Sequence, residues 1–209
     1  MLQELVFTIG HSTHAQERLI GLLVQHNVTA VCDIRSKPYS RMSPQFNREE
    51  IRRQLRTAGL SYVFLGHELG ARSADPSAYD QGKVQYERLA LTDLFQQGLT
   101  RVREGLKNYR IALMCAEKDP LECHRALLVA RYLARFGIGI EHIHADGRLE
   151  SHAEAMERLV SQLNLPQFDM FRSHEDILED AYRIQEGRIA YTLDDATGGD
   201  PVDTKVATG

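Results

Sequence analysis

The chain of 209 residues is long enough for one well-packed domain with a small addition, and 43% hydrophobic with 26% charged residues is a globular composition. A formal net charge of -4 argues against strong nonspecific attraction to nucleic acid, and no apolar run approaches the roughly 20 residues that span a bilayer. The first residues lack the basic and then apolar pattern of a signal peptide, and three cysteines are an odd number for a disulfide framework. We therefore expect a reducing, cytoplasmic location and no membrane partner.

Five apolar segments have the length and composition of buried strands. They are predicted at Leu5–Gly10, Thr29–Arg35, Ser61–Gly66, Arg110–Glu117 and residues 139–147. Each is short and apolar, and turn-forming residues such as Gly or Pro occur near its ends. The polar stretch from His67 to about Gln81 is predicted to be a long loop.

Helices are predicted between these strands from their capping signals. Thr13 and Gln16 resemble a capping box, Asn47 is a candidate cap for a helix that ends at Gly59, and Ser151 begins a later helix. Further helices are predicted up to about Lys107, over residues 123–137 and over residues 173–187.

Apolar strands separated by helices indicate a mostly parallel sheet that is covered on both faces. We predict an α/β, Rossmann-like fold with a sheet of about five strands and helices on both faces. The α/β domain is expected over residues 1–165 and a C-terminal helical appendage over residues 166–192. Residues 193–209 contain few large apolar groups, and we expect them to form a disordered tail.

In open parallel sheets, ligands bind beyond the carboxyl ends of the strands. That rule selects polar residues that follow each predicted strand and places them at one edge of the sheet. They are His11, Ser12, Asp33, Arg35, Gly66, His67, Glu68, Cys115, Glu117, Cys123, His124, Arg125, His144 and Asp146.

Cys123 is the candidate nucleophile of this set. It stands where a helix is expected to begin, beside His124 and Arg125, and a helix N-terminus with nearby cations favours the thiolate form. His124 is the candidate acid or base that would act with it, and His11 and Glu117 are further acid–base candidates. A structural role in the core is the alternative for Cys123, since cysteine is also a good small core residue.

Two other cysteine chemistries are less well supported by the spacing, a phosphatase-type loop and the sulfurtransferase-like gap between Cys32 and Lys37. The residue six positions after each cysteine is Pro38, Leu121 or Val129, so no cysteine has the arginine of a phosphatase-type loop. Cys32 is expected inside a buried strand and therefore in the core.

Metal binding is the rival interpretation, and two groups of soft ligands could provide it. The first group is Cys115, Cys123 and His124, and the second is His142, His144 and His152. Neither a C-x-x-C nor an H-E-x-x-H motif is present, so the sequence specifies neither a metal nor another cofactor.

Arg35 is the favoured anion binder, because its guanidinium fork fits phosphate or carboxylate. The expected helix N-termini at Thr13 and Cys123 would direct backbone N–H groups to the same region. A structural ion pair between Asp33 and Arg35 is the alternative. The chain has neither G-x-G-x-x-G nor a P-loop, which argues against an ordinary dinucleotide or nucleoside triphosphate site.

Four stretches, taken jointly and in this order, resemble a bacterial and archaeal family described as domain of unknown function 488. They are Thr8–Ser12, Asp33–Phe46, Leu65–Gly70 and Cys115–Arg125. Ala71 departs from the pattern, which would place a second glycine there. The resemblance implies an α/β domain and a set of edge residues that recurs, including Ser40 of the second stretch. It implies no activity, because the family description assigns none.

Three functions are consistent with these features. The first is an enzyme, a transferase or hydrolase rather than an oxidoreductase, that acts on an anionic, phosphate-bearing substrate such as a nucleotide or nucleic-acid fragment. Its candidate catalytic residues are Cys123, His124, His11 and Glu117, and its candidate binding residues are Ser12, Asp33, Arg35, Ser40, Gly66, Glu68 and Arg125. The second is a non-catalytic module that binds a nucleotide or nucleic acid. The third is a metal-binding protein with Cys115, Cys123 and His124 as ligands. The sequence does not specify an oligomeric state.

Overall fold

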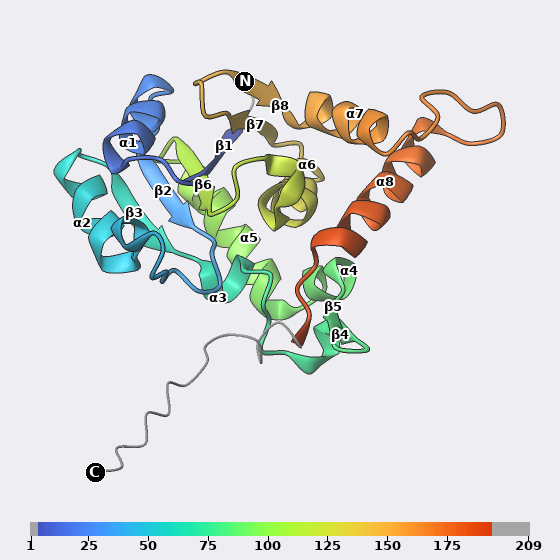
Figure 1. Ribbon diagram of the computed structural model, residues 1–209, viewed down its shortest axis with the longest axis horizontal. Coiled ribbons are helices and arrows are strands. Elements are labelled where there is room, and N and C mark those ends of the chain that lie inside the picture. The colour runs from blue at the N-terminus through green and yellow to red at the C-terminus, as the bar shows by residue number, and fades with distance from the viewer. Residues whose placement is uncertain (1–3, 194–209) are drawn as a thin grey trace, which may run out of the picture.

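The computed structural model describes residues 4–193, and a six-stranded sheet lies at its centre (Figure 1). The strand order is β3-β2-β6-β1-β7-β8. The strands are β1 (Leu5–Gly10), β2 (Ala30–Asp33), β3 (Ser61–Phe64), β6 (Ile111–Cys115), β7 (Gly139–Ile143) and β8 (Leu149–Ser151). The first five named are mutually parallel and β8 is antiparallel to β7. The predicted α/β, Rossmann-like class is confirmed, and β8 is a strand that the prediction lacked.

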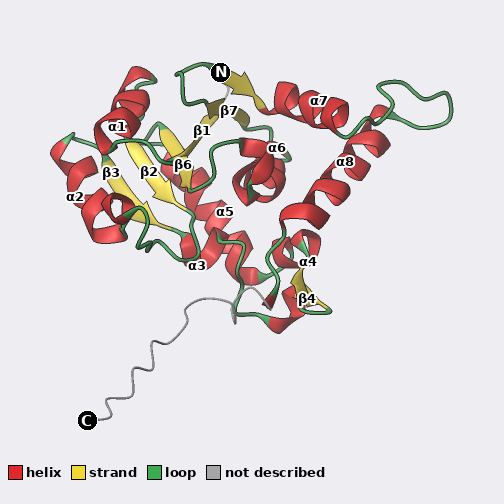
Figure 2. Ribbon diagram, viewed as in Figure 1, coloured by secondary structure: helices red, strands yellow, loops and turns green. Residues whose placement is uncertain are grey.

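Helices cover both faces of this sheet, as predicted (Figure 2). On one face, α1 (Gln16–Gln25) and α2 (Arg48–Thr57) bury leucine and isoleucine side chains against Phe7, Val31 and Met114. The larger core lies on the other face, around Val6, Cys32 and Leu113. Its helical segments are α3 (Gly66–Leu69), α4 (Tyr86–Ala90), α5 (Asp93–Leu106), the π-helical η4 (Arg125–Ala130), α6 (Arg131–Ala134), α7 (His152–Gln162) and α8 (His174–Ile189). The burial of Cys32 in the core is as expected.

The segment after β3 differs from the long loop that was predicted. It contains α3, a 3₁₀ turn η2 (Pro76–Ala78) and a small antiparallel pair, β4 (Tyr79–Asp80) with β5 (Lys83–Val84). Further 3₁₀ turns, η1 (Pro44–Phe46) and η3 (Pro120–Glu122), lie in other loops. Leu69 of α3 is fully buried and packs closely against Gly98 of α5, so tertiary packing stabilises a helix too short to be stable alone.

Two of the three predicted caps are corrected by the structure. Helix α1 begins after Ala15, so Thr13 is not its cap, and no side chain caps that end. Asn47 does precede α2, but its Oδ1 accepts a hydrogen bond from the Ser40 N–H (2.7 Å) instead of capping the helix. Ser151 caps α7 in a complete capping box with Glu154, as predicted.

The C-terminal helix α8 packs on the large core through Ile177, Ala181 and Tyr182. The expected disordered tail, apart from Leu193, lies outside the residues that the structure describes. Within residues 4–193, no helix has the length and apolar character needed to cross a membrane.

Candidate functional site

The carboxyl ends of β1, β6 and β2 lie side by side in the middle of the sheet. Gly10 pairs with Cys115, and the His11 N–H donates to the Cys115 carbonyl oxygen (2.9 Å). The chain after β1 lies so close to the chain after β6 that a Cβ at Gly10 would be 1.8 Å from the Glu117 carbonyl oxygen. Only glycine fits there, and this explains the glycine in the Thr8–Ser12 stretch.

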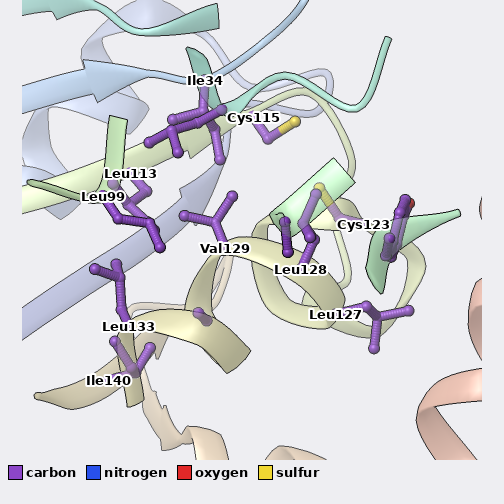
Figure 3. Close-up of a cluster of buried hydrophobic side chains, with 14 of the residues drawn as sticks. Ile34, Leu99, Leu113, Cys115, Cys123, Leu127, Leu128, Val129, Leu133 and Ile140 are labelled. Carbon is purple, nitrogen blue, oxygen red and sulfur yellow. The ribbon is translucent and has the colours of Figure 1, made fainter. Parts of the chain in front are cut away.

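Two cysteines and a histidine converge beyond the end of β6. Cys115 is the last residue of β6, and Cys123 follows the turn η3 (Figure 3). His124 is the next residue in the chain. His124 Nδ1 lies 3.8 Å from Cys115 Sγ and 3.9 Å from Cys123 Sγ. Cys123 Sγ also donates to Glu117 Oε2 (2.9 Å). We call Cys115, Glu117, Cys123 and His124 the thiol cluster. Both cysteines are nearly inaccessible, at 2% and 1% exposure, whereas Glu117 is an exposed residue whose carboxyl reaches inward.

The imidazole of His124 has a defined orientation. Its Nε2 lies 3.1 Å from the carbonyl oxygen of Ile34, which can only accept a hydrogen bond. In its neutral form the ring therefore carries its proton on Nε2, and the lone pair of Nδ1 faces the two sulfur atoms. Burial would lower the pKa of His124, but the negative charge of Cys123 raises it, and a protonated Nδ1 donates towards the sulfur atoms.

The thiol cluster perturbs the acidity of its members. Burial raises the pKa of Cys115. Burial would also raise the pKa of Cys123, but the hydrogen bond with Cys115 and the positive charges of Arg125 and His124 hold it well below its usual range. Partial burial and the nearby Cys123 raise the pKa of Glu117. The Arg125 backbone N–H, in the first turn of η4, also points to Cys123 Sγ (3.4 Å), as expected for a cysteine that precedes a helix.

Arg125 holds the loop after β6 in place. Its Nη1 and Nη2 donate to the carbonyl oxygens of Glu117 (2.8 Å) and Lys118 (2.9 Å), and the residue is 1% exposed. These bonds engage two of the three nitrogens of the guanidinium that was predicted to bind an anion, and its Nε is buried without a hydrogen-bond partner. In this structure Arg125 positions the loop that carries Glu117.

Arg35 is likewise engaged within the protein. It forms a two-pronged pair with Asp33, Nε to Oδ1 at 2.9 Å and Nη2 to Oδ2 at 2.6 Å, and it donates to the Phe46 carbonyl oxygen. Asp33 is fully buried and also accepts from the Tyr62 hydroxyl (2.8 Å). This geometry is the Asp33–Arg35 ion pair that the sequence left as an alternative.

His11 supports that pair. Its Nδ1 lies 2.9 Å from the Ser12 carbonyl oxygen and its Nε2 lies 3.1 Å from Arg35 Nη1, so the ring donates at one nitrogen and accepts at the other. Burial lowers the pKa of His11 to about 4, and the charge of Arg35 contributes to the shift. A neutral ring with both nitrogens engaged positions Arg35, which is a different role from the acid–base one that was predicted.

The remaining predicted binding residues stabilise turns, form an ion pair with a neighbouring helix or allow close backbone packing. The Ser40 hydroxyl accepts from the N–H groups of Met42 and Ser43. Glu68 forms an ion pair with Arg101 of α5. Gly66 is buried where a Cβ would be 2.0 Å from the Arg35 carbonyl oxygen, and Ser12 has a left-handed backbone (φ 47°).

A cavity of about 310 Å³ opens beside the thiol cluster. Five of the residues singled out from the sequence line it: Arg35, Cys115, Glu117, Cys123 and His124. The others that line it are Ser36, Lys37, Ala71, Arg72, Tyr86, Ala116, Glu122, Ile189 and Tyr191. Lys37 lies two residues after Arg35, within a stretch already singled out from the sequence, and could have been named. Tyr191, which Arg72 covers at 4.5 Å from the ring centroid, gave no sequence signal.

The second predicted metal group does not form, because its histidines have different partners. His142 contacts Thr8 Oγ1 (2.7 Å) and His152 Nδ1 (3.1 Å), whereas His144 binds Glu150 (2.8 Å). Among residues 4–193, Cys115, Cys123 and His124 are the one set of three or more such ligands that converge, with all three ligand atoms within 4.8 Å of one another.

The parallel sheet and its strand-end cavity define an α/β protein of Rossmann-like type. A family model described as "Domain of unknown function DUF488" matches residues 15–133, and the chain belongs to that family, as the four sequence stretches implied. The comparison with curated proteins finds no match, and neither does the comparison with solved structures. Most of the cavity lies within the matched residues, whereas Ile189 and Tyr191 come from beyond them.

Proposed function

We propose that the protein is an enzyme that binds a small anionic substrate in this cavity and transfers or hydrolyses a group at the thiol cluster. One observation carries the proposal: the same cavity is lined by exposed cations and by the buried thiol cluster. Its volume of about 310 Å³ is at the lower end of the range for small-molecule sites, which favours a small phosphate or carboxylate compound.

Lys37 and Arg72 are the groups that would hold the negative charge. Both are exposed, and neither forms an ion pair with another residue in the range 4–193. They replace Arg35 and Arg125 in this role, because those two guanidinium groups already bind Asp33 and backbone carbonyls. A cation without an ion pair keeps its full charge for a ligand, whereas a two-pronged pair with a buried carboxylate is largely neutral.

The thiol cluster supplies groups that can react at the inner end of the cavity. Cys123 and Glu117 share a hydrogen bond, so a proton can pass between sulfur and carboxylate. Tyr86 and Tyr191 also line the cavity. A substrate whose anionic group contacts Lys37 and Arg72 would place its other end towards this cluster.

Binding is tested with the variants Lys37→Gln and Arg72→Gln, with Lys107→Gln as the matched control. Lys107 is an exposed lysine that pairs with Glu104 and does not line the cavity. Calorimetric titration with inorganic phosphate, nucleoside monophosphates and sugar phosphates should find a ligand. A charge-assisted hydrogen bond contributes about 1.5–3 kcal/mol, so each cavity variant should weaken binding by about 10-fold or more. Equal affinity in all three variants would refute the assignment of these two cations.

Turnover is tested on the same compounds with Cys123→Ser and Glu117→Gln. Both variants should keep ligand affinity within a few-fold and lose turnover, because neither residue is assigned to the anionic group. A protein that binds these compounds tightly but turns none of them over would be a binding module instead.

A further inference from the structure

We infer that Cys115, Cys123 and His124 bind one zinc-class divalent metal ion through two sulfur atoms and one imidazole nitrogen. The ion's fourth coordination position would open to the cavity. This inference goes beyond the proposed function, and its test requires no substrate.

The donor set is one that zinc commonly uses. Thiolate and imidazole are soft to borderline ligands, and they favour zinc over magnesium or calcium, which prefer oxygen. Two cysteines and one histidine with an open position form a known type of catalytic zinc site, whereas structural sites have four protein ligands.

The nitrogen–sulfur distances are close to those of a tetrahedral site. With zinc–sulfur bonds of about 2.3 Å and zinc–nitrogen bonds of about 2.0–2.1 Å, ligand atoms in a tetrahedron lie about 3.5–3.8 Å apart. Here Nδ1 of His124 lies 3.8 Å and 3.9 Å from the two sulfur atoms. All three ligand atoms lie within 4.8 Å of one another, so side-chain rotations would bring the two sulfur atoms to their tetrahedral separation when the ion binds.

His124 is oriented as metal ligands usually are. A histidine ligand typically donates its other ring N–H to a carboxylate or a backbone carbonyl, which fixes the tautomer and the direction of the lone pair. The contact of Nε2 with the Ile34 carbonyl oxygen has this form, and it directs Nδ1 to the sulfur atoms.

Hydrogen bonds outside the ligand set hold the loop after β6 in place. Asp119 accepts from the Leu121 N–H (2.9 Å) at the start of η3, and Arg158 binds both carboxylate oxygens of Asp119 (2.9 and 3.0 Å). Arg125 binds the carbonyl oxygens of Glu117 and Lys118. The turn that brings Cys123 back to Cys115 is thus fixed by contacts outside the ligand set.

Charge and access also fit a cation. Ion binding would replace the two thiol protons, which leave to solvent, and a divalent charge would balance the two thiolates that form. All three ligand residues line the cavity, so a water molecule or a substrate oxygen could reach the fourth position. Glu117, hydrogen-bonded to Cys123, lines the same cavity.

Zinc binding can be measured directly on the full chain. The metal-free protein, prepared with a chelator, is titrated with zinc against a chromophoric indicator, and the metal content is measured by elemental analysis. We expect one zinc ion per chain. Cys115→Ser, Cys123→Ser and His124→Gln should each weaken binding by more than the roughly 10- to 100-fold cost of losing an outer-sphere partner.

Cys32→Ala is the matched control, because Cys32 is buried in β2 and lies outside the ligand set. It should keep one zinc ion per chain, and so should Lys37→Gln, which separates this result from the anion-binding test. Cobalt titration of the unmodified protein checks the ligands without a variant: thiolate-to-cobalt charge-transfer bands and intense visible bands of tetrahedral cobalt are expected. Less than a tenth of an equivalent of bound zinc, or a cobalt spectrum without thiolate bands, would overturn the inference.

Discussion

A buried chain of histidines should make the protein sensitive to mild acid. His142 Nε2 contacts His152 Nδ1 at 3.1 Å, and His152 Nε2 contacts the Tyr182 hydroxyl at 2.8 Å. Burial lowers the pKa of His152 from 6.5 to about 4, and the positive charge of Arg131 adds to this effect. The neutral ring is therefore the form that the folded protein accommodates.

The sign and size of the effect follow from proton linkage. As the pH falls below about 6.5, the unfolded chain takes up a proton on His152, whereas the folded protein does so only near pH 4. The stabilisation that comes from keeping His152 neutral is fully present above the pKa of the unfolded chain, about 6.5, and is lost as the pH falls towards 4. Between pH 7 and pH 5 the difference amounts to about 2 kcal/mol. His142 acts in the same direction, since burial also lowers its pKa.

The assay is urea unfolding at pH 7 and at pH 5, with the free energy of unfolding compared between variants. His152→Gln should lose about 2 kcal/mol less than the unmodified protein over this interval. His174→Gln is the comparison variant, because His174 is an exposed histidine at the start of α8 that pairs with Glu157 and lies outside the buried chain. If His152→Gln loses as much stability on acidification as the unmodified protein, the buried ring is not the source of the sensitivity.

Three further substitutions test the packing around the site. Gly10→Ala should lower the free energy of unfolding in urea by about 3 kcal/mol or more, because its Cβ would lie 1.8 Å from the Glu117 carbonyl oxygen. The control Gly21→Ala lies in open space within α1 and should raise the free energy of unfolding by up to about 1 kcal/mol. Arg35→Met leaves the carboxylate of Asp33 buried without its cation, so it should lower the free energy of unfolding by about 3–5 kcal/mol. A decrease of less than about 1 kcal/mol at pH 7 would contradict this prediction. Ser151→Ala removes the capping box of α7 and should lower the thermal midpoint by the equivalent of about 1 kcal/mol, with unchanged stability counting against the cap.

Local sequence pattern was sufficient to predict most of the strands and helices around the site. The five parallel strands were predicted because each is a short apolar run bounded by turn residues, and that pattern depends on neighbouring residues alone. The capping box of Ser151 and the core position of Cys32 were predicted for the same reason. The convergence of Cys115, Glu117, Cys123 and His124 on one cavity followed from the rule for strand ends in parallel sheets.

Elements whose stability comes from distant contacts were missed. Strand β8 has only three residues and pairs with the exposed edge of β7, so its own sequence carries no alternation to detect. Helix α3 has four residues and depends on its packing against α5. Neither element would be stable in isolation, because short segments gain too little from local hydrogen bonds.

The sequence alone determined which chemical groups collect at the sheet edge, and the tertiary structure decided which of them are available. Arg35 and Arg125 were predicted to bind an anion, but Asp33 and two backbone carbonyls occupy their donors. Lys37 and Arg72 line the cavity without ion pairs, and their availability could not be read from their own segments. A side chain's availability depends on partners that folding brings from elsewhere in the chain, and residue spacing does not encode those partners.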